Sequence, residues 1–218
     1  MLTPIDAYFG QWSPLARLQD SAIRGYWDEL AGSRADVYWN DRRGAGPDLV
    51  PGSGAMTFGS RKGRETAIFD GSTWIEVAFA NAQPLAIVVA VKFTSAIPPP
   101  VLIDGVGATA TVQLSGLSEI TINAGTALAA TFSSSLKDRW VVVGAIFNGA
   151  NSSIYENGIL RASGDAGANN PTGLRLGADN SGTQAFTGEV AELHCMDPTT
   201  LHPHHMTVDS WYQMRKWV

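Results

Sequence analysis

The segment Ile154-Tyr155-Glu156-Asn157-Gly158-Ile159-Leu160 carries the strongest local structural signal in the chain. Two runs that favour β-structure flank the dipeptide Asn157-Gly158. Asn and Gly both accept positive φ, which the two central residues of a type I′ turn require, and this turn matches the twist of paired strands. The segment therefore predicts a β-hairpin of two antiparallel strands.

Short β-rich runs separated by Gly, Pro, Asn and Asp continue in both directions from this hairpin. Two of them, 86–91 and 140–147, are almost continuously apolar, which is typical of strands buried deep in a sandwich. No strand–helix alternation of the kind that builds a parallel sheet is present. We therefore expect an all-β, two-sheet antiparallel sandwich, with strands at 55–58, 66–69, 74–79, 85–93, 101–104, 108–114, 119–123, 128–132, 140–148, 152–156, 159–162, 174–177 and 188–196.

Helical patterns flank the β-rich region at both ends. Ser13-Pro14 is a favourable helix start, and apolar residues then recur at helical spacing, which predicts an amphipathic helix over residues 14–30. A short second helix is expected from Thr207 to the C-terminus, where Arg215 and Lys216 suit its last turn. We divide the chain into an N-terminal arm and helix at 1–31 and a sandwich domain with its C-terminal helix at 32–218.

The predicted N-terminal helix carries apolar surface that a sandwich does not need, because two stacked sheets already bury their inner faces against each other. We expect this helix to dock on another chain as an assembly element. The competing interpretation is that it folds back over one end of the sandwich. Aromatic residues near the termini extend the prediction, since aromatics are enriched at interfaces. The predicted interface consists of Leu15, Leu18, Ala22, Tyr26, Trp211 and Trp217, whereas Trp74 and Trp140 are expected to fill core positions.

Three patches occur in order along the chain: Trp39, Asp41 and a Gly-rich turn within residues 37–49, the Phe69-Asp70-Gly71 turn and the aromatic strand after it within residues 67–77, and the 157–158 hairpin turn followed by residues 174–177 and 186–193. In this order they resemble the laminin-G/pentraxin/concanavalin A-like superfamily, particularly the jelly-roll modules of bacteriophage and bacterial surface proteins. The resemblance implies a jelly roll of two packed antiparallel sheets, one of them concave. It implies no single function, because this fold carries lectins, hydrolases and structural modules.

The composition of the chain limits the classes of partner that it is expected to bind. Charged residues make up only 16% of the chain and the net charge is −5, so a phosphate backbone is repelled and we expect no nucleic-acid partner. No window approaches the roughly 20 apolar residues of a membrane helix, so we expect no membrane insertion. The N-terminus has no secretory signal pattern. The one cysteine, Cys195, lies in an apolar run and is expected to be a buried small hydrophobe.

Catalytic signals are weak. Glycoside hydrolysis needs two carboxylates that flank an open cleft, and concanavalin-like glucanases carry theirs at alternating positions of one strand. Glu189 and Glu192 are three residues apart, which predicts that they point to opposite faces of their strand. No nucleophile elbow, phosphate-binding loop or dinucleotide fingerprint is present. We therefore expect that the chain is not an enzyme and has no catalytic residue.

Metal ligands are equally sparse. His202, His204 and His205 lie close together, but a structural zinc site needs four ligands of suitable geometry, so we interpret them as an exposed loop. Calcium is common in the resembled superfamily and is the alternative. Its candidate ligands are Asp70, Asp104, Asp179 and Asn180, which are also ordinary turn-forming residues. We expect no metal and no cofactor.

The function that these observations predict is a non-enzymatic structural or adhesion module of a virus particle, such as a phage capsid-decoration or tail-associated protein. Such a module would be made in the host cytoplasm, reside in the virion, and bind other virion proteins or copies of itself. The alternative is a carbohydrate-binding, lectin-like domain that recognises a cell-surface glycan.

Overall fold

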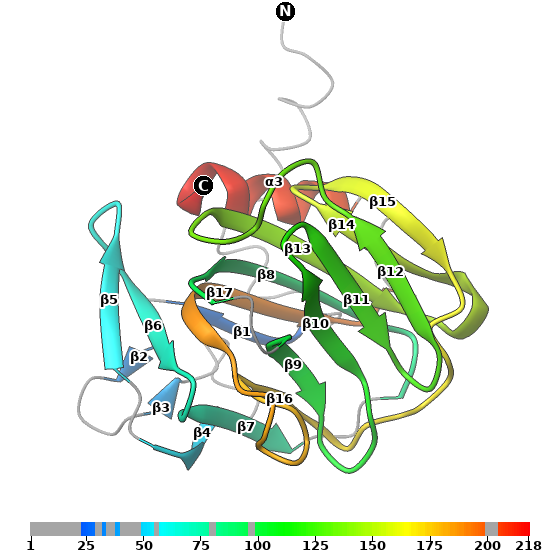
Figure 1. The fold of residues 1–218 in the computed structure, drawn as a ribbon, viewed down its shortest axis with the longest axis horizontal. Helices are drawn as coiled ribbons and strands as arrows, with labels where there is room; N and C mark the ends of the chain where they lie inside the picture. Colours follow the sequence, from blue (N-terminus) through cyan, green and yellow to red (C-terminus); the bar gives the residue numbers. More distant parts are fainter. Residues whose placement is uncertain are drawn as a thin grey trace, which may run out of the picture.

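Two antiparallel sheets are stacked on each other in the computed structural model of the protein (Figure 1). The structure describes residues 23–28, 32–33, 38–39, 49–54, 57–78, 82–95, 99–198 and 205–218. One sheet has eight strands and the other has seven, and a small third sheet pairs β2 (Gly32–Ser33) with β3 (Tyr38–Trp39). The two-sheet antiparallel sandwich expected from the sequence is confirmed.

The eight-stranded sheet is built around β17, the longest strand. Its order is β15 (Ile159–Gly164), β14 (Ser152–Glu156), β13 (Trp140–Phe147), β8 (Leu85–Phe93), β17 (Thr187–Met196), β6 (Arg64–Asp70) and β5 (Thr57–Arg61). The first part of β17 pairs with β6, and its second part pairs with β1 (Ile23–Asp28). A short 3-10 helix, η1 (Gly149–Asn151), connects β13 to β14.

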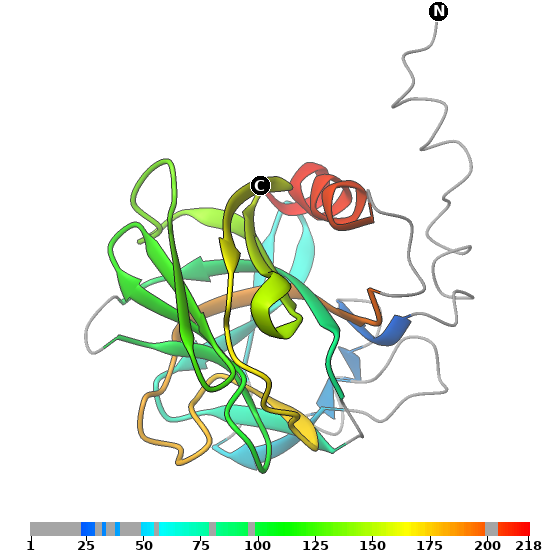
Figure 2. The ribbon, with the colours of Figure 1, turned by 90° about the vertical axis from the view of Figure 1, so that its right-hand side faces the viewer.

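The seven-stranded sheet covers the other side of the core. Its order is β12 (Ala127–Thr131), β11 (Glu119–Asn123), β10 (Thr111–Gly116), β9 (Val101–Gly105), β16 (Gly173–Leu176), β7 (Trp74–Ala78) and β4 (Val50–Ser53). Figure 2 shows the sandwich from its side, with the green strands of this sheet on the left and the red C-terminal helix on the upper right. The helix therefore lies on the side of the molecule away from the seven-stranded sheet.

The Asn157-Gly158 turn has the geometry that its sequence predicts. Both residues have positive φ, 49° and 82°, and Glu156 pairs with Ile159 across the turn. A Cβ at position 158 would also make a tight contact, 3.2 Å from the backbone oxygen of Thr207. The hairpin thus also contacts the C-terminal helix.

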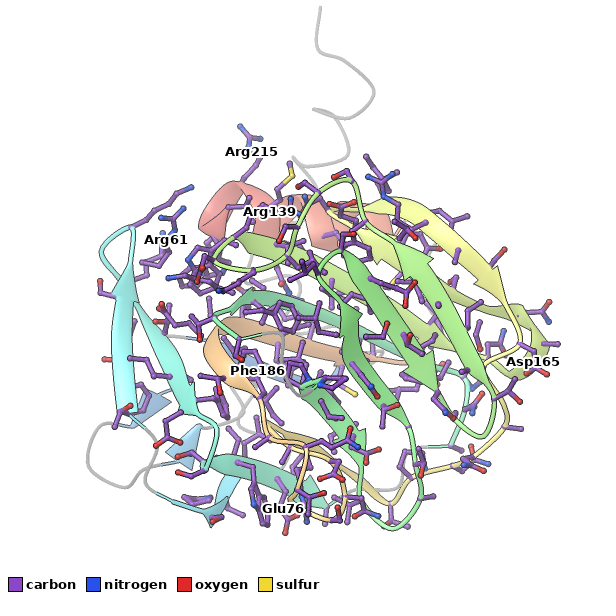
Figure 3. All side chains as sticks on the ribbon, viewed as in Figure 1. Arg61, Glu76, Arg139, Asp165, Phe186 and Arg215 are labelled. Atoms are coloured by element: carbon purple, nitrogen blue, oxygen red, sulfur yellow. The ribbon has the colours of Figure 1, made fainter. Side chains whose placement is uncertain are left out.

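The core lies between the inner faces of the two sheets. Every second residue of a strand points inward, and the alternating residues Val112, Leu114, Ile120 and Ile122 are fully buried in it. Phe186 contacts Phe69 and Phe93, with ring centroids 5.6 and 5.5 Å away, and Figure 3 shows it inside the sandwich. Cys195 is buried here, as expected.

A second apolar cluster lies on the outer face of the eight-stranded sheet, beneath α3 (His205–Trp217). This face is apolar because a helix covers it, which explains why the runs in β8 and β13 are apolar on both faces. Its members are Ala86, Val88, Ala90, Trp140, Val142, Ala191, Met196, Met206 and Trp217. The expected C-terminal helix and the expected burial of Trp140 are both confirmed. No described helix is both long and apolar enough to cross a membrane.

The N-terminal helix prediction is wrong for residues 23–28, which form strand β1 on the edge of β17. The spacing of apolar residues is a local property, and it does not indicate that this segment pairs with another strand through backbone hydrogen bonds. Residues 14–22 lie outside the described part of the chain, and the boundary between 31 and 32 stays a prediction. The thirteen predicted strands all occur with small shifts at their ends, and β1 to β4 were not expected.

Candidate functional site

The outer face of the seven-stranded sheet is called the open face here. It is formed by outward-pointing residues of β10, β11 and β12 at one end and of β7 and β16 at the other, because their strand neighbours point into the core. Among described elements, α3 covers only the opposite sheet. The open face is therefore where half-exposed side chains gather on a rigid scaffold, and these are Gln113, Ser115, Glu119, Thr121, Asn123, Trp74, Glu76 and Arg175.

Hydroxyl and carboxylate groups are linked across β10 and β11. Thr121 Oγ1 donates to Ser115 Oγ at 2.8 Å, and Ser115 Oγ donates to Glu119 Oε1, also at 2.8 Å. Gln113 pairs with Thr121 in the register of the two strands, so its amide stands beside this chain of hydrogen bonds. The strands thus present a pre-ordered row of donors and acceptors at the surface.

The other end of the open face is organised by Arg175. Its Nε and Nη2 donate to Glu76 Oε2 at 3.3 and 3.0 Å, and its guanidinium carbon lies 3.8 Å from the centroid of the Trp74 ring. The ring also lies directly over Gly52, where any Cβ would collide with it. The two hydrogen bonds to one carboxylate oxygen and the cation–π contact together hold these three side chains in one arrangement.

Trp74 corrects an expectation, because its side chain is half-exposed on the open face and is not in the core. Its indole N–H donates no hydrogen bond to any residue that the structure describes. A signal for this placement exists in the sequence. In the run Trp74-Ile75-Glu76-Val77, the apolar Ile75 and Val77 alternate with Trp74 and Glu76, so a buried Ile75 requires an outward Trp74.

The loop between β16 and β17 borders Trp74 and is fixed by carboxylates. Asp179 Oδ1 accepts the backbone N–H groups of Thr183 and Gln184, and its Oδ2 accepts the Ser181 hydroxyl. Burial opposes ionisation of Asp179, but the hydrogen bonds from Ser181, Gln184 and Thr183 outweigh it and lower its pKa. Arg175 Nη1 donates to the carbonyls of Asp179 and Asn180 at 2.9 and 2.8 Å. The loop therefore holds exposed amide and hydroxyl side chains beside the indole.

Asp104 supports the same loop from beneath. Its Oδ2 accepts the Asn180 N–H at 2.7 Å, and its Oδ1 accepts the N–H groups of Gly105 and Ala110. Desolvation by burial raises the pKa of Asp104, and the nearby negative charge of Asp179 acts in the same direction. The structure thus brings together three of the four candidate calcium ligands.

These ligands are occupied as turn supports. Asp70, the fourth candidate, caps the β6–β7 turn: its Oδ1 accepts the N–H and hydroxyl of both Ser72 and Thr73, and these bonds, led by the Ser72 N–H, lower its pKa to about 2. Within the described ranges, no group of three or more His, Cys, Asp and Glu side chains could hold a metal ion. His202 and His204 lie outside the described residues, as does the side chain of His205.

The prediction that Glu189 and Glu192 point to opposite faces is wrong. Glu189 pairs with Lys92 and Glu192 pairs with Ala90, two residues of β8 that share one face. A β-bulge between Val190 and Glu192 inserts one extra residue and restores the carboxylates to the same side. Both therefore lie on the outer face of the eight-stranded sheet, on the side of α3.

Both carboxylates have partners within the chain. Glu189 Oε1 forms an ion pair with Lys92 Nζ at 3.2 Å, and its Oε2 accepts the Thr66 hydroxyl at 3.0 Å. Glu192 is fully buried, and three donors converge on it: His194 Nε2 at 2.7 Å, Trp217 Nε1 at 2.7 Å and Lys216 Nζ at 2.9 Å.

Two of the donors to Glu192 belong to α3, so the carboxylate anchors this helix to the sheet. Arg61 strengthens the attachment from β5, since its Nε donates to the Trp217 carbonyl at 3.1 Å. Desolvation opposes the charge of Glu192, but the bonds and charges of His194, Lys216 and Trp217 outweigh it and lower its pKa to about 2. Because an ionised carboxylate only accepts, His194 Nε2 carries the proton.

The predicted partner interface is corrected at Trp217. Its indole is fully buried within this chain, where it binds Glu192, and so it offers no surface to a partner. Tyr26 lies in β1 and Trp211 in α3, but their side chains are outside the described residues, as are Leu15, Leu18 and Ala22 entirely. For these five positions the interface stays a prediction.

Comparisons with known proteins show the fold. No family model matches the sequence, and no curated protein matches it significantly. Domain 4 of AbnA, a GH43 extracellular arabinanase from Geobacillus stearothermophilus solved in complex with arabinotriose, has a TM-score of 0.66 at 14% identity, over 86% of this chain and 97% of that domain. The receptor-binding domain of botulinum neurotoxin type G has a TM-score of 0.64 at 14% identity, over 88% of this chain.

Trypanosoma rangeli sialidase also matches, with a TM-score of 0.61 at 15% identity over 89% of this chain. The chain spans 33% of the sialidase and 52% of the toxin domain. These likenesses agree with the jelly-roll resemblance, and at such identities they describe the fold alone.

Proposed function

We propose that this chain is a carbohydrate-binding, lectin-like module without catalytic activity, and that it binds glycan on the open face. The observation that carries the proposal is the contrast between the two outer faces of the sandwich. The face under α3 is covered by that helix, and its apolar and charged groups are occupied by contacts within the chain, whereas the open face presents an ordered row of hydroxyl, amide and carboxylate groups.

These residue types suit a sugar. Each sugar hydroxyl both donates and accepts a hydrogen bond, so it is best bound by groups that include both kinds. Ser115 and Thr121 supply hydroxyls, Gln113 supplies an amide, and Glu119 supplies acceptors. The protein has fixed them in advance on neighbouring strands, which lowers the entropy lost on binding.

The dimensions favour an oligosaccharide over a single sugar. From β11 to β7 the sheet crosses four strand spacings, or about 19 Å. The hydroxyl row stands at one end of this distance, and the Trp74 edge with its indole N–H stands at the other. All five residues of β9, which lies between the two ends, are buried, so an extended ligand that contacts both ends would pass over the covered outer side of this strand.

The known neighbours support the same reading. One of the matched structures is an arabinanase domain in complex with arabinotriose, and that domain is covered over 97% of its length. Absence of catalysis is supported by the two carboxylates on β17, because Glu192 is buried beneath α3 and Glu189 is ion-paired with Lys92. The role in a virus particle, with virion location and partners, remains a second hypothesis that no described feature favours.

The test is glycan binding by the purified protein, measured first on an array and then by calorimetry with a hit oligosaccharide. The variant Gln113→Ala/Thr121→Ala removes open-face donors, and Thr57→Ala/Ser60→Ala on edge strand β5 is the matched control. We expect the first to weaken binding at least tenfold, about 1.4 kcal/mol, and the control to leave it unchanged. Failure to bind any glycan, or equal binding by both variants, would contradict the proposal.

A further inference from the structure

We infer that the glycan bound by the open face carries no negative charge, an inference that rests on the proposed function and specifies its ligand class. The observation behind it is the segregation of charge between the two sheets. The seven strands of the seven-stranded sheet contain one cationic residue, Arg175, against three acidic residues, Glu76, Asp104 and Glu119.

The cationic side chains described in the eight-stranded sheet and in α3 are more numerous. Arg61 and Arg64 belong to β5 and β6, Lys92 to β8, Arg161 to the edge strand β15, where it is ion-paired with Glu156, and Arg215 and Lys216 to the last turn of α3. Figure 3 shows Arg61, Arg139 and Arg215 in the upper part of the molecule, and Glu76 at its lower edge. An anionic ligand is therefore not drawn toward the open face.

Arg175, the one cationic residue of these seven strands, already forms hydrogen bonds with acceptors of this chain. Nε and Nη2 donate to the carboxylate of Glu76, and Nη1 donates to the carbonyls of Asp179 and Asn180. One face of its guanidinium plane lies against Trp74. All three nitrogens thus have protein acceptors, and the Nε–Nη2 edge, with which an arginine could bind an anionic sugar, is taken by Glu76 Oε2.

The uncompensated carboxylate of the open face also repels an anion. Glu119 stands in the hydroxyl row, half-exposed, whereas the charge of Glu76 at the far end is neutralised by its ion pair with Arg175. A carboxylate or sulfate on a sugar bound there meets the negative charge of Glu119 at one end and finds no free cationic donor on these strands. An uncharged oligosaccharide meets neither penalty, and its hydroxyls can donate to both carboxylates.

The experiment measures affinity for matched glycans: neutral oligosaccharides and the same chains carrying a uronic acid, a sialic acid or a sulfate. We expect the acidic member of each pair to bind about tenfold more weakly, about 1.4 kcal/mol, as the single negative charge of Glu119 about 4 Å away at a partly hydrated surface implies. The difference in affinity between the neutral and acidic glycans should shrink in 1 M salt, because salt at this concentration screens interactions between charges more than about 3 Å apart.

A charge variant tests the cause. Thr131 is exposed on β12 and pairs directly with Glu119, so Thr131→Lys places a cation beside that carboxylate. We expect Thr131→Lys to reduce the affinity difference between neutral and acidic glycans several-fold. Ser60→Lys, the same charge change on β5 of the other sheet, should leave this affinity difference unchanged.

The possible outcomes separate the two proposals. Equal or tighter binding of the acidic glycans by the unaltered protein overturns this inference and leaves the proposed function standing. Binding of no glycan at all overturns both. The salt dependence of the unaltered protein decides the electrostatic cause even if Thr131→Lys does not fold.

Discussion

Replacing Glu192 by Gln is the most informative perturbation of the fold. The carboxylate is fully buried and is held by His194 Nε2, Trp217 Nε1 and Lys216 Nζ at 2.7 to 2.9 Å. Gln keeps the shape and one acceptor but loses the negative charge, so the nearly buried ammonium of Lys216 loses the counter-charge that Glu192 supplies. Removal of one member of a buried ion pair is strongly destabilising.

The magnitude follows from the pKa. In the folded protein the pKa of Glu192 is about 2, below the ordinary value of 4.5, so the folded state binds the ionised form more strongly. Each pKa unit corresponds to 1.36 kcal/mol, which gives about 3 kcal/mol of stability from the charge. A depressed pKa means that this stability is present above pH 4.5 and is lost as the pH falls from there toward 2. For a chain of this size, about 3 kcal/mol lowers the Tm by about 6–12 °C.

The assay is denaturant unfolding at pH 7 and at steps down to pH 2, for the unaltered protein and Glu192→Gln. The difference between the two should be about 3 kcal/mol at pH 7 and should shrink below pH 4.5. Glu189→Gln is the control: that carboxylate is partly exposed, so its ion pair with Lys92 should contribute no more than about 1 kcal/mol. A difference between unaltered protein and Glu192→Gln that is the same at pH 7 and pH 2.5 would refute the reasoning.

Three other predictions follow from described contacts. Gly158→Val should destabilise the protein by about 2 kcal/mol or more in thermal unfolding, because φ is 82° and the new Cβ would press on the Thr207 carbonyl of α3; Ile159→Val should have little effect. Glu156→Gln should cost about 2 kcal/mol in urea unfolding, because Glu156 is buried and binds Ser133, Arg139 and Arg161. Chelation with EDTA should leave the Tm unchanged, since protein donors occupy the candidate calcium ligands; a fall of more than about 10 °C would show that a metal stabilises the fold.

Local sequence chemistry determined much of the fold. Asn157-Gly158 accepts the two positive φ values of its turn, and the apolar alternation in β10 and β11 assigns one face of each strand to the core. These features could be predicted because turn chemistry and side-chain alternation act over a few neighbouring residues. The same alternation placed Trp74 and Glu76 on the outside, although the aromatic character of Trp74 had favoured the core.

The candidate site was less predictable, because its members come from distant strands. Arg175 and Glu76 are 99 residues apart and meet only because β16 pairs with β7. Nothing in the neighbourhood of either residue indicates this register. The hydroxyl row on β10 and β11 is closer in sequence, but whether its face is exposed depends on which sheet the C-terminal helix covers.

The strand β17 shows most clearly which features depend on the local sequence and which depend on the tertiary structure. The sequence by itself determined that residues near 188–196 form a β-strand, since their residue types and alternation are local properties. Only the tertiary structure decided that an extra residue bulges between Val190 and Glu192, which turns Glu192 toward α3, and that residues 23–28 pair with the same strand. Bulges and strand partners depend on hydrogen bonds between segments far apart in the chain. A local sequence pattern does not indicate which distant segment will supply these hydrogen bonds.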